Sequence, residues 1–189
     1  MTESVTKRKT NSKVAMMILT ALFAALTAVC AWISIPLPFT PVPVILATMV
    51  TTLAGGLLGW KYGSVSMIVY LLLGAVGAPV FHNFTGGLGI LTGPTGGYLV
   101  GYITSALICG ILLDVICRKK LTWWGIAISG IVGLASCYAL GTAWFMISTG
   151  TGLAASMVSC VIPFLPGDVL KTILAVILIL KLRPIVYKR

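Results

Sequence analysis

Two oppositely charged residues, Asp168 and Lys171, stand alone in a long uncharged part of the sequence. They belong to the segment Phe-Leu-Pro-Gly-Asp-Val-Leu-Lys at residues 164–171, which is typical of the start of a helix. Residues three apart share one face of a helix, so the carboxylate and the ammonium are expected side by side. Next to a helix N-terminus, such a pair suits a ligand that carries both an anionic group and N–H donors.

The pair also has a purely structural interpretation. Asp168 follows a Pro-Gly pair and is suited to cap the helix by accepting hydrogen bonds from free backbone N–H groups. Lys171 could then extend to the outer lipid headgroups or pair with Asp168. The sequence leaves both interpretations open.

A glycine-rich segment at residues 81–98 is the second candidate site. Six glycines fall within residues 86–97, where the backbone is expected to turn sharply or to approach a ligand closely. The segment contains neither a Walker A loop nor a complete G-x-G-x-x-G fingerprint, so it predicts no nucleotide site. His82 and Asn83 are more typical of polar loop residues than of ligand contacts, although Asn83 offers one donor and one acceptor to an amide-like ligand. Tight helix packing explains any single glycine equally well.

Alanines recur at helical spacing on the first apolar segment. Ala21 and Ala25 form one small-xxx-small pair, and Ala24 and Ala28 form another. Such pairs let a second helix approach closely, and that helix is either an internal neighbour or a partner subunit. Three aromatic residues in residues 122–147 could line an apolar pocket or serve only in helix packing: Tyr138, Trp144 and Phe145.

The elements that position these residues must cross a membrane. The 189 residues include 13 Lys/Arg and 3 Asp/Glu, 59% are hydrophobic, and the mean hydropathy is +1.10. Only 8% are charged, against about 25% in soluble domains, which excludes a soluble enzyme or DNA-binding protein. Three uncharged stretches, at residues 14–60, 62–113 and 121–167, are each long enough for two membrane helices of about 20 residues.

Prolines and glycines divide these stretches into six predicted spans. We expect helices at residues 14–35, 44–60, 62–78, 95–117, 122–147 and 166–183. Four prolines close the first span, and the last is expected to end before Pro184. The apolar run of the first span is too long for a cleavable signal peptide. The predicted fold is therefore an all-α membrane protein of six transmembrane helices, with one domain at residues 13–189 after a basic tail at residues 1–12.

The positions of the basic residues predict the orientation. Six spans place both termini on one side together with twelve of the 13 Lys/Arg, and they leave Lys171 alone on the other side. By the positive-inside rule the basic side, with both termini, is cytoplasmic. Extracellular loops such as residues 81–97 would then partly cap a ligand pocket. The net charge of +10 thus reflects topology and contact with anionic membrane lipid, and it does not indicate nucleic acid binding.

Cysteine and histidine predict little chemistry. The five cysteines lie within or at the ends of apolar helices without C-x-x-C spacing, so we expect free packing residues. One histidine and the two aspartates, Asp114 and Asp168, do not suffice for a metal cage, and we expect no metal and no cofactor.

Three longer motifs resemble those of a known family. They are Leu-Gly-Ala-Val-Gly-Ala-Pro-Val-Phe at residues 73–81, Gly-Gly-Leu-Gly and Gly-Pro-Thr-Gly-Gly-Tyr-Leu within residues 86–99, and Pro-Phe-Leu-Pro-Gly-Asp-Val-Leu-Lys at residues 163–171. They are similar to the signature segments of BioY, the biotin-specific substrate-binding subunit of energy-coupling-factor (ECF) transporters. The resemblance extends over nearly all of the chain after the basic tail.

This resemblance implies a multi-pass protein of the prokaryotic plasma membrane that is not an enzyme and that binds extracellular biotin with high affinity for ATP-driven uptake. It implies a transmembrane coupling subunit, which would meet Ala21 and Ala25, and two ATP-binding-cassette ATPases as partners. It also places the substrate-binding region at these residues: Asn83, Gly87, Gly89, Thr95, Tyr98, Asp168 and Lys171.

One segment departs from the family pattern. Relatives commonly continue the Pro-Val-Pro of the first loop with Thr-Leu-Gln-Thr, whereas residues 45–48 here are Ile-Leu-Ala-Thr. A polar contact made by that glutamine would be missing. His82 and Asn83 also stand where small residues are frequent.

Two other functions fit part of the sequence. A secondary transporter would also use an intramembrane charge pair, but usually with more spans or an internal repeat, and we find no repeat between the halves. A membrane enzyme would need a nucleophile with a base, or a metal set.

Overall fold

Helices make up most of the chain in the computed structural model, which describes residues 13–38, 40–118 and 120–187. The tail predicted for residues 1–12 lies outside the described residues. In chain order the elements are α1 (Lys13–Trp32), β1 (Ser34–Leu37), β2 (Thr40–Ile45), α2 (Ala47–Ala75), the 3₁₀ turn η1 (His82–Phe84), α3 (Leu88–Thr92), α4 (Gly96–Ile116), α5 (Trp123–Thr149), α6 (Leu153–Cys160), the 3₁₀ turn η2 (Ile162–Phe164) and α7 (Leu165–Tyr187).

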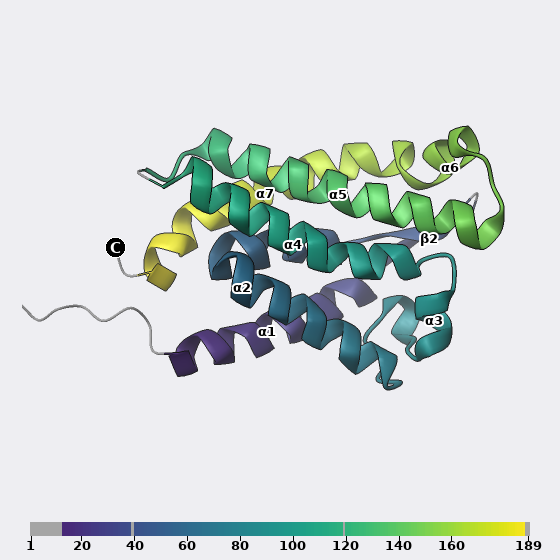
Figure 1. Ribbon diagram of the computed structural model, residues 1–189, viewed down its shortest axis with the longest axis horizontal. Coiled ribbons are helices and arrows are strands. Elements are labelled where there is room, and N and C mark those ends of the chain that lie inside the picture. The colour runs from purple at the N-terminus through teal and green to yellow at the C-terminus, as the bar shows by residue number, and fades with distance from the viewer. Residues whose placement is uncertain (1–12, 39, 119, 188–189) are drawn as a thin grey trace, which may run out of the picture.

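The long helices lie side by side along the long axis of the molecule (Figure 1). α2 consists of two arms that fold back on each other at Gly59, whose φ of 76° and ψ of 176° favour glycine. Gly63 of the second arm packs so tightly on the first that an added Cβ would lie 2.7 Å from the carbonyl oxygen of Ala54. The two arms, with α1, α4, α5 and α7, give the six helical passes that were predicted. The reversal lies two residues before the predicted turn at Lys61.

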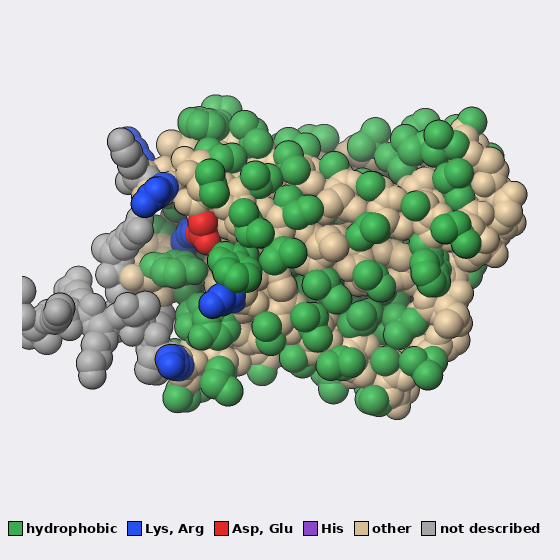
Figure 2. Space-filling view, viewed as in Figure 1, with side chains coloured by type: hydrophobic (Ala, Val, Ile, Leu, Met, Phe, Trp, Pro, Cys, Tyr) green, Lys and Arg blue, Asp and Glu red, His purple; other side chains and the backbone are tan. Residues whose placement is uncertain are grey.

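Length and composition let α1, α2, α4 and α5 cross a membrane. α7 is also long, but it carries four charged residues: Asp168, Lys171, Lys181 and Arg183. Figure 2 shows that the Lys and Arg side chains on one face gather at the end where the C-terminus lies. Apart from Asp168 and Lys171, the described helices are therefore uncharged along most of their length and basic at one end.

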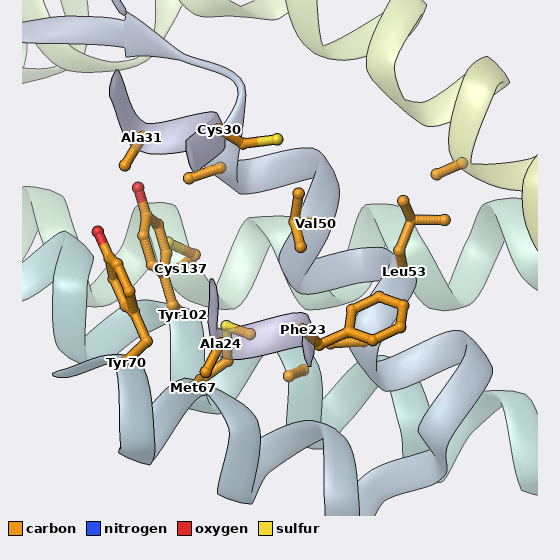
Figure 3. Packing of buried hydrophobic residues seen from close by; sticks show 14 of the residues in the cluster. Phe23, Ala24, Cys30, Ala31, Val50, Leu53, Met67, Tyr70, Tyr102 and Cys137 are labelled. Atoms are coloured by element: carbon orange, nitrogen blue, oxygen red, sulfur yellow. The ribbon is translucent and has the colours of Figure 1, made fainter. Parts of the chain in front are cut away.

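α4 occupies the centre of the bundle and packs against both α2 and α5. In the core, the ring of Tyr70 from the second arm of α2 stacks on that of Tyr102 from α4 at a centroid distance of 6.3 Å (Figure 3). Gly133 of α5 lets that helix approach α4 closely, because an added Cβ would lie 2.8 Å from the carbonyl oxygen of Ser105. All five cysteines are buried and none of them forms a disulfide, as predicted.

The first loop forms a β-hairpin that the all-α prediction did not include. β1 and β2 pair antiparallel, with Ser34 opposite Ile45 and Leu37 opposite Thr40. The prolines of this loop favoured an irregular connection, but in a two-stranded ribbon each strand keeps one unpaired edge, where a missing N–H is tolerated. The hairpin lies at the end of the bundle opposite the C-terminus, near α3 and α6 (Figure 1).

The prediction that the last helix ends before Pro184 is wrong, because α7 continues to Tyr187. Proline cannot donate the hydrogen bond to the carbonyl four residues earlier. Only the bond from position 184 to the carbonyl of Leu180 is lost, and the three residues after Pro184 continue the helix.

Candidate functional site

The isolated charges of α7 form a buried ion pair. The Nζ of Lys171 lies 3.1 Å from Oδ1 of Asp168. Asp168 lies in the first turn of α7 and is only 4% exposed. Burying two charges costs several kcal/mol per ion unless further hydrogen bonds compensate them. The surroundings of this pair therefore decide whether it can persist.

Two neighbouring helices supply that compensation. The Tyr138 hydroxyl of α5 donates a hydrogen bond to Oδ2 of Asp168. Lys171 donates to the hydroxyl of Thr48 in α2 at 3.1 Å, and Thr48 in turn donates to the carbonyl of Ile45 at 3.3 Å. Among the described residues, the carboxylate oxygens of Asp168 receive hydrogen bonds from side chains and none from backbone N–H groups. The structure thus holds an ion pair joined to two other helices instead of a helix cap.

The ion pair lies in a cleft with about 530 Å³ of free space, its open mouth included. The side chains that line the cleft around the ion pair are mostly aromatic and aliphatic: Val42, Pro43, Ile45, Thr48, His82, Thr95, Tyr98, Leu99, Tyr102, Tyr138, Phe164, Asp168 and Lys171.

Aromatic rings from three helical elements form the apolar part of the cleft. Tyr98 of α4 and Tyr138 of α5 meet edge to face, with ring centroids 6.4 Å apart. The Tyr98 hydroxyl lies 3.3 Å from the hydroxyl of Thr142, which holds the ring in place. With Phe164 of η2, these rings can cover an apolar ring system while the ion pair binds polar groups.

His82 of η1 also lines the cleft. Burial lowers the pKa of its imidazole below the ordinary value of 6.5. His82 is therefore neutral at pH 7 and adds no second cation beside Lys171.

The cleft is narrow as it stands. Only about 50 Å³ of it can take the centre of a water molecule, which is room for about four waters. A ligand larger than a few water molecules therefore has to displace some of the lining segments. The lining residues of β2 and η1 lie on short elements at the end of the bundle, whereas Tyr102 and Asp168 lie in long packed helices.

The structure brings together four of the seven predicted binding residues. Asp168, Lys171, Tyr98 and Thr95 all line the cleft. The other three predicted residues, in the glycine-rich segment, do not line it: Asn83, Gly87 and Gly89.

These three residues shape the loop beside the cleft. Asn83 is exposed, has a φ of 54°, and accepts a hydrogen bond from the Ser34 hydroxyl of the hairpin at 3.3 Å. Gly87 has a φ of 99°, and its N–H donates to the carbonyl of Gly74 at 2.7 Å. Gly89 is exposed on the short helix α3.

Sequence reasoning missed Thr48 and Tyr102, and it left Tyr138 undecided between pocket wall and packing. Thr48 stands 123 positions before Lys171, and Tyr138 stands 30 before Asp168. A polar residue in an apolar helix is the available signal for Thr48, but Thr51 and Thr52 beside it give the same signal. Only the packing of α2 and α5 on α7 selects the contacting residues.

A family model now accounts for almost the whole chain, since the model described as "BioY family" matches residues 3–188. The chain belongs to the BioY family. It is accordingly a multi-pass membrane protein of a transport system and not an enzyme.

Relatives in the BioY family match along most of their length. The biotin transporter BioY of Thermotoga maritima is 40% identical over 169 residues, which are 89% of this chain and 95% of the relative. The biotin transporter BioY of Lactococcus lactis subsp. cremoris is 33% identical over 179 residues, 92% of this chain and 93% of the relative. The crystal structure of the S-component for biotin from an ECF-type ABC transporter superposes with a TM-score of 0.86 at 31% identity, covering 96% of this chain and 99% of that one.

The segment that departs from the BioY pattern begins α2. Ala47, which stands in place of the glutamine, is fully buried in the core. Its neighbour Thr48 carries a hydroxyl that contacts Lys171. Thr48 thus supplies a polar contact to the ion pair from the helical turn that also contains Ala47.

The two alanine pairs of α1 face different ways. Ala24 and Ala28 are 2% and 7% exposed and pack inside the bundle. Ala21 and Ala25 are exposed. The first pair thus serves internal packing, and the second is available to another helix.

Removal of the Tyr138 hydroxyl is expected to destabilise this BioY-family protein. In Tyr138→Phe the buried Asp168 loses one donor, at an expected cost of about 1–3 kcal/mol. Tyr70→Phe is the matched control, because the Tyr70 hydroxyl is buried without a hydrogen-bond partner among the described residues. Thermal unfolding in detergent should give a lower Tm for Tyr138→Phe and an unchanged or higher Tm for Tyr70→Phe. Equal losses in both variants would contradict the role given to Tyr138.

Proposed function

We propose that this chain is the substrate-binding membrane subunit of an ECF-type importer and that it captures biotin from outside the cell. The observation that carries the proposal is the buried Asp168–Lys171 pair in an aromatic cleft, in a chain whose relatives are named biotin transporters. A charge pair enclosed in an otherwise apolar membrane bundle is costly, and a polar substrate gives a reason to keep it.

The chemistry of biotin suits the groups that line the cleft. Biotin has a carboxylate at the end of an aliphatic tail, a ureido group with two N–H donors and a carbonyl, and an apolar thiophane ring. Lys171 is the cation for the carboxylate, and Asp168 is the acceptor for a ureido N–H. Tyr98, Tyr102 and Phe164 provide apolar surface for the thiophane ring. Thr95 adds a hydroxyl at the wall of the cleft.

The glycine-rich loop has a supporting role in this proposal. Asn83 holds the loop to the hairpin through Ser34, and Gly87 anchors it to Gly74 at the end of α2. Gly89 is the exposed second residue of the short helix α3. Together with the hairpin, these residues form the extracellular structure that partly caps the cleft.

The proposed topology has six transmembrane passes with both termini in the cytoplasm. Lys171 lies in the cleft that β2 of the hairpin helps to line, at one end of the bundle (Figure 1). Lys13 begins α1, and Lys181 and Arg183 lie near the C-terminal end of α7, at the other end (Figure 1). By the positive-inside rule, that second end faces the cytoplasm of a prokaryotic plasma membrane. The cleft is then reached from outside.

We further propose that transport requires a transmembrane coupling subunit and two ATP-binding-cassette ATPases. The support within this chain is the exposed pair Ala21 and Ala25, whose small side chains allow a partner helix to approach. The sequence contains no nucleotide-binding motif, so ATP hydrolysis has to come from partner proteins.

Proteoliposomes test this function against that of a stand-alone transporter. Vesicles are prepared with this chain alone or with the coupling subunit and both ATPases, and uptake of radiolabelled biotin is measured. Accumulation is expected only with the complete set and internal ATP. Rapid accumulation by the chain alone under an ion gradient would overturn the proposal.

A further inference from the structure

A second, wider cavity lies at the end of the bundle that carries the C-terminus. It has about 1,100 Å³ of free space, its open mouth included, and about 510 Å³ of that space can take the centres of water molecules. We call it the basic pocket and define it by five of its lining residues: Asp114, Arg118, Lys120, Arg183 and Tyr187. It lies far along the bundle from the cleft, since it is formed by the C-terminal ends of α4 and α7 and the loop after α4.

The basic pocket has more cations than its carboxylate can neutralise. Arg183 forms an ion pair with Asp114. The described residues contain no salt bridge for Arg118 or Lys120, so two positive charges face the pocket without a carboxylate partner. The pocket therefore favours an anionic occupant.

Arg183 also has unused hydrogen-bonding capacity. Its Nη2 contacts Asp114, and its guanidinium lies 5.4 Å from the ring centre of Tyr187. Its Nη1 is buried and has no hydrogen-bond partner among the described residues. A guanidinium binds phosphate oxygens through paired N–H groups, and this arrangement leaves one such donor group without an acceptor.

Aromatic residues place this end at the level of lipid headgroups. Trp123 and Trp124 begin α5 and are 67% and 48% exposed. Trp60 is 42% exposed, and the Nζ of Lys61 lies 5.2 Å from the centre of its ring. Exposed tryptophans mark the membrane–water interface in membrane proteins. The basic pocket therefore opens where phosphate groups of lipids lie.

The helices that form the pocket also expose apolar side chains next to its charged residues. Val115 follows Asp114 on α4 and is 67% exposed. Ile185 lies two residues after Arg183 on α7 and is 68% exposed. A molecule with a phosphate head and acyl chains finds both kinds of surface here.

We propose that the basic pocket binds the phosphate group of an anionic phospholipid from the leaflet at this end of the bundle. Arg118 and Lys120 attract the headgroup, and Arg183 stays paired with Asp114 at the wall of the pocket. The acyl chains lie against the exposed apolar turns of α4 and α7.

Native mass spectrometry of the purified full chain tests this proposal with phosphatidylglycerol and, separately, with phosphatidylcholine. The test variant is Arg118→Gln with Lys120→Gln. The matched control is Lys13→Gln with Lys61→Gln, which removes the same charge from the same end but outside the pocket. Biotin binding by both variants reports that they are folded, and the single variant Lys120→Gln replaces the test variant if that one does not fold.

Wild-type protein and the control are expected to retain one phosphatidylglycerol in preference to phosphatidylcholine. The pocket variant should need at least about tenfold more phosphatidylglycerol for the same occupancy. Equal retention by the pocket variant and the control would overturn the proposal.

Two further measurements distinguish a bound lipid from other occupants of the basic pocket. Phosphatidylglycerol should raise the Tm of the wild type, whereas inorganic phosphate at the same concentration should not. An equal rise with inorganic phosphate would assign the pocket to free phosphate. If lipid retention is unchanged in the pocket variant but its capture by the coupling subunit is lost, the pocket is a protein contact and the lipid proposal is wrong.

Discussion

Replacement of Lys171 by alanine, or of Asp168 by asparagine, is expected to weaken biotin binding by more than tenfold. Each change removes a charged hydrogen bond from a buried site, a loss of about 1.5–3 kcal/mol, and about 1.4 kcal/mol corresponds to a factor of ten in affinity. Asp168→Asn also leaves the buried ammonium of Lys171 without its counter-ion, 3.1 Å away in the parent chain. Isothermal titration of the detergent-purified chain with biotin measures the effect.

Lys61→Ala is the matched control for these variants. Lys61 is exposed and lies over the ring of Trp60, away from the cleft. The substitution removes one cation outside the cleft, so biotin affinity should stay at the parent value. If affinity is unchanged in both site variants as well, the Asp168–Lys171 pair only stabilises the bundle, and biotin binds elsewhere.

A second large effect is expected on α1, where Ala21→Trp combined with Ala25→Trp should abolish assembly with the coupling subunit. Both alanines are exposed on the surface of the isolated chain. Close packing on a small-residue face does not accommodate two indole rings, and even a few added methylenes in a packed contact cost about 1–3 kcal/mol. Co-purification with the coupling subunit should be lost together with ATP-dependent biotin uptake, while biotin affinity of the isolated chain stays unchanged.

Leu26→Trp controls for the size of the new side chain on the same helix. Leu26 is 38% exposed and points about 100° away from Ala25 around the helix. This variant should assemble and transport like the parent chain. Loss of assembly in Leu26→Trp, or normal assembly of the double variant, would contradict the assignment of the alanine pair as the contact.

Charge spacing predicted the helical passes because a bilayer tolerates few ions. Residues 14–60, 62–113 and 121–167 contain no Asp, Glu, Lys or Arg. The first two stretches each fold into two passes, and the third folds into α5 followed by the short helix α6. The reversal within α2 was placed at the charged Lys61, but the residue that turns the chain is Gly59. A polar residue marks a turn only to within a few positions, whereas a positive φ requires a particular residue type.

The elements at the end of the bundle that carries the hairpin were not predictable from the same signals. The hairpin of β1 and β2 contains four of the prolines that otherwise favour an irregular loop. α6 lies in a stretch that is uncharged throughout, so its boundaries have no charge or proline signal before Pro163. Pro184 predicted a helix end, but α7 continues to Tyr187 and lacks only the hydrogen bond that position 184 would donate.

The residues of the candidate site were likewise only partly predictable from the sequence. Asp168 and Lys171 were found because each is a charge that membrane insertion alone does not explain. Tyr138 and Thr48, which compensate them, come from α5 and α2, and no local pattern links them to α7. Asn83 was considered as a ligand contact for its chemistry, but its positive φ and its bond to Ser34 fit a structural role in the loop.

Identification of the small molecule that leaves the purified protein on denaturation tests the central claim most directly. The full chain is produced in cells grown with biotin, purified in detergent, washed and denatured, and the released molecules are analysed by mass spectrometry. Biotin is predicted in near-stoichiometric amount from the parent chain and in much smaller amount from Lys171→Ala. Release of a different vitamin in place of biotin would contradict this account.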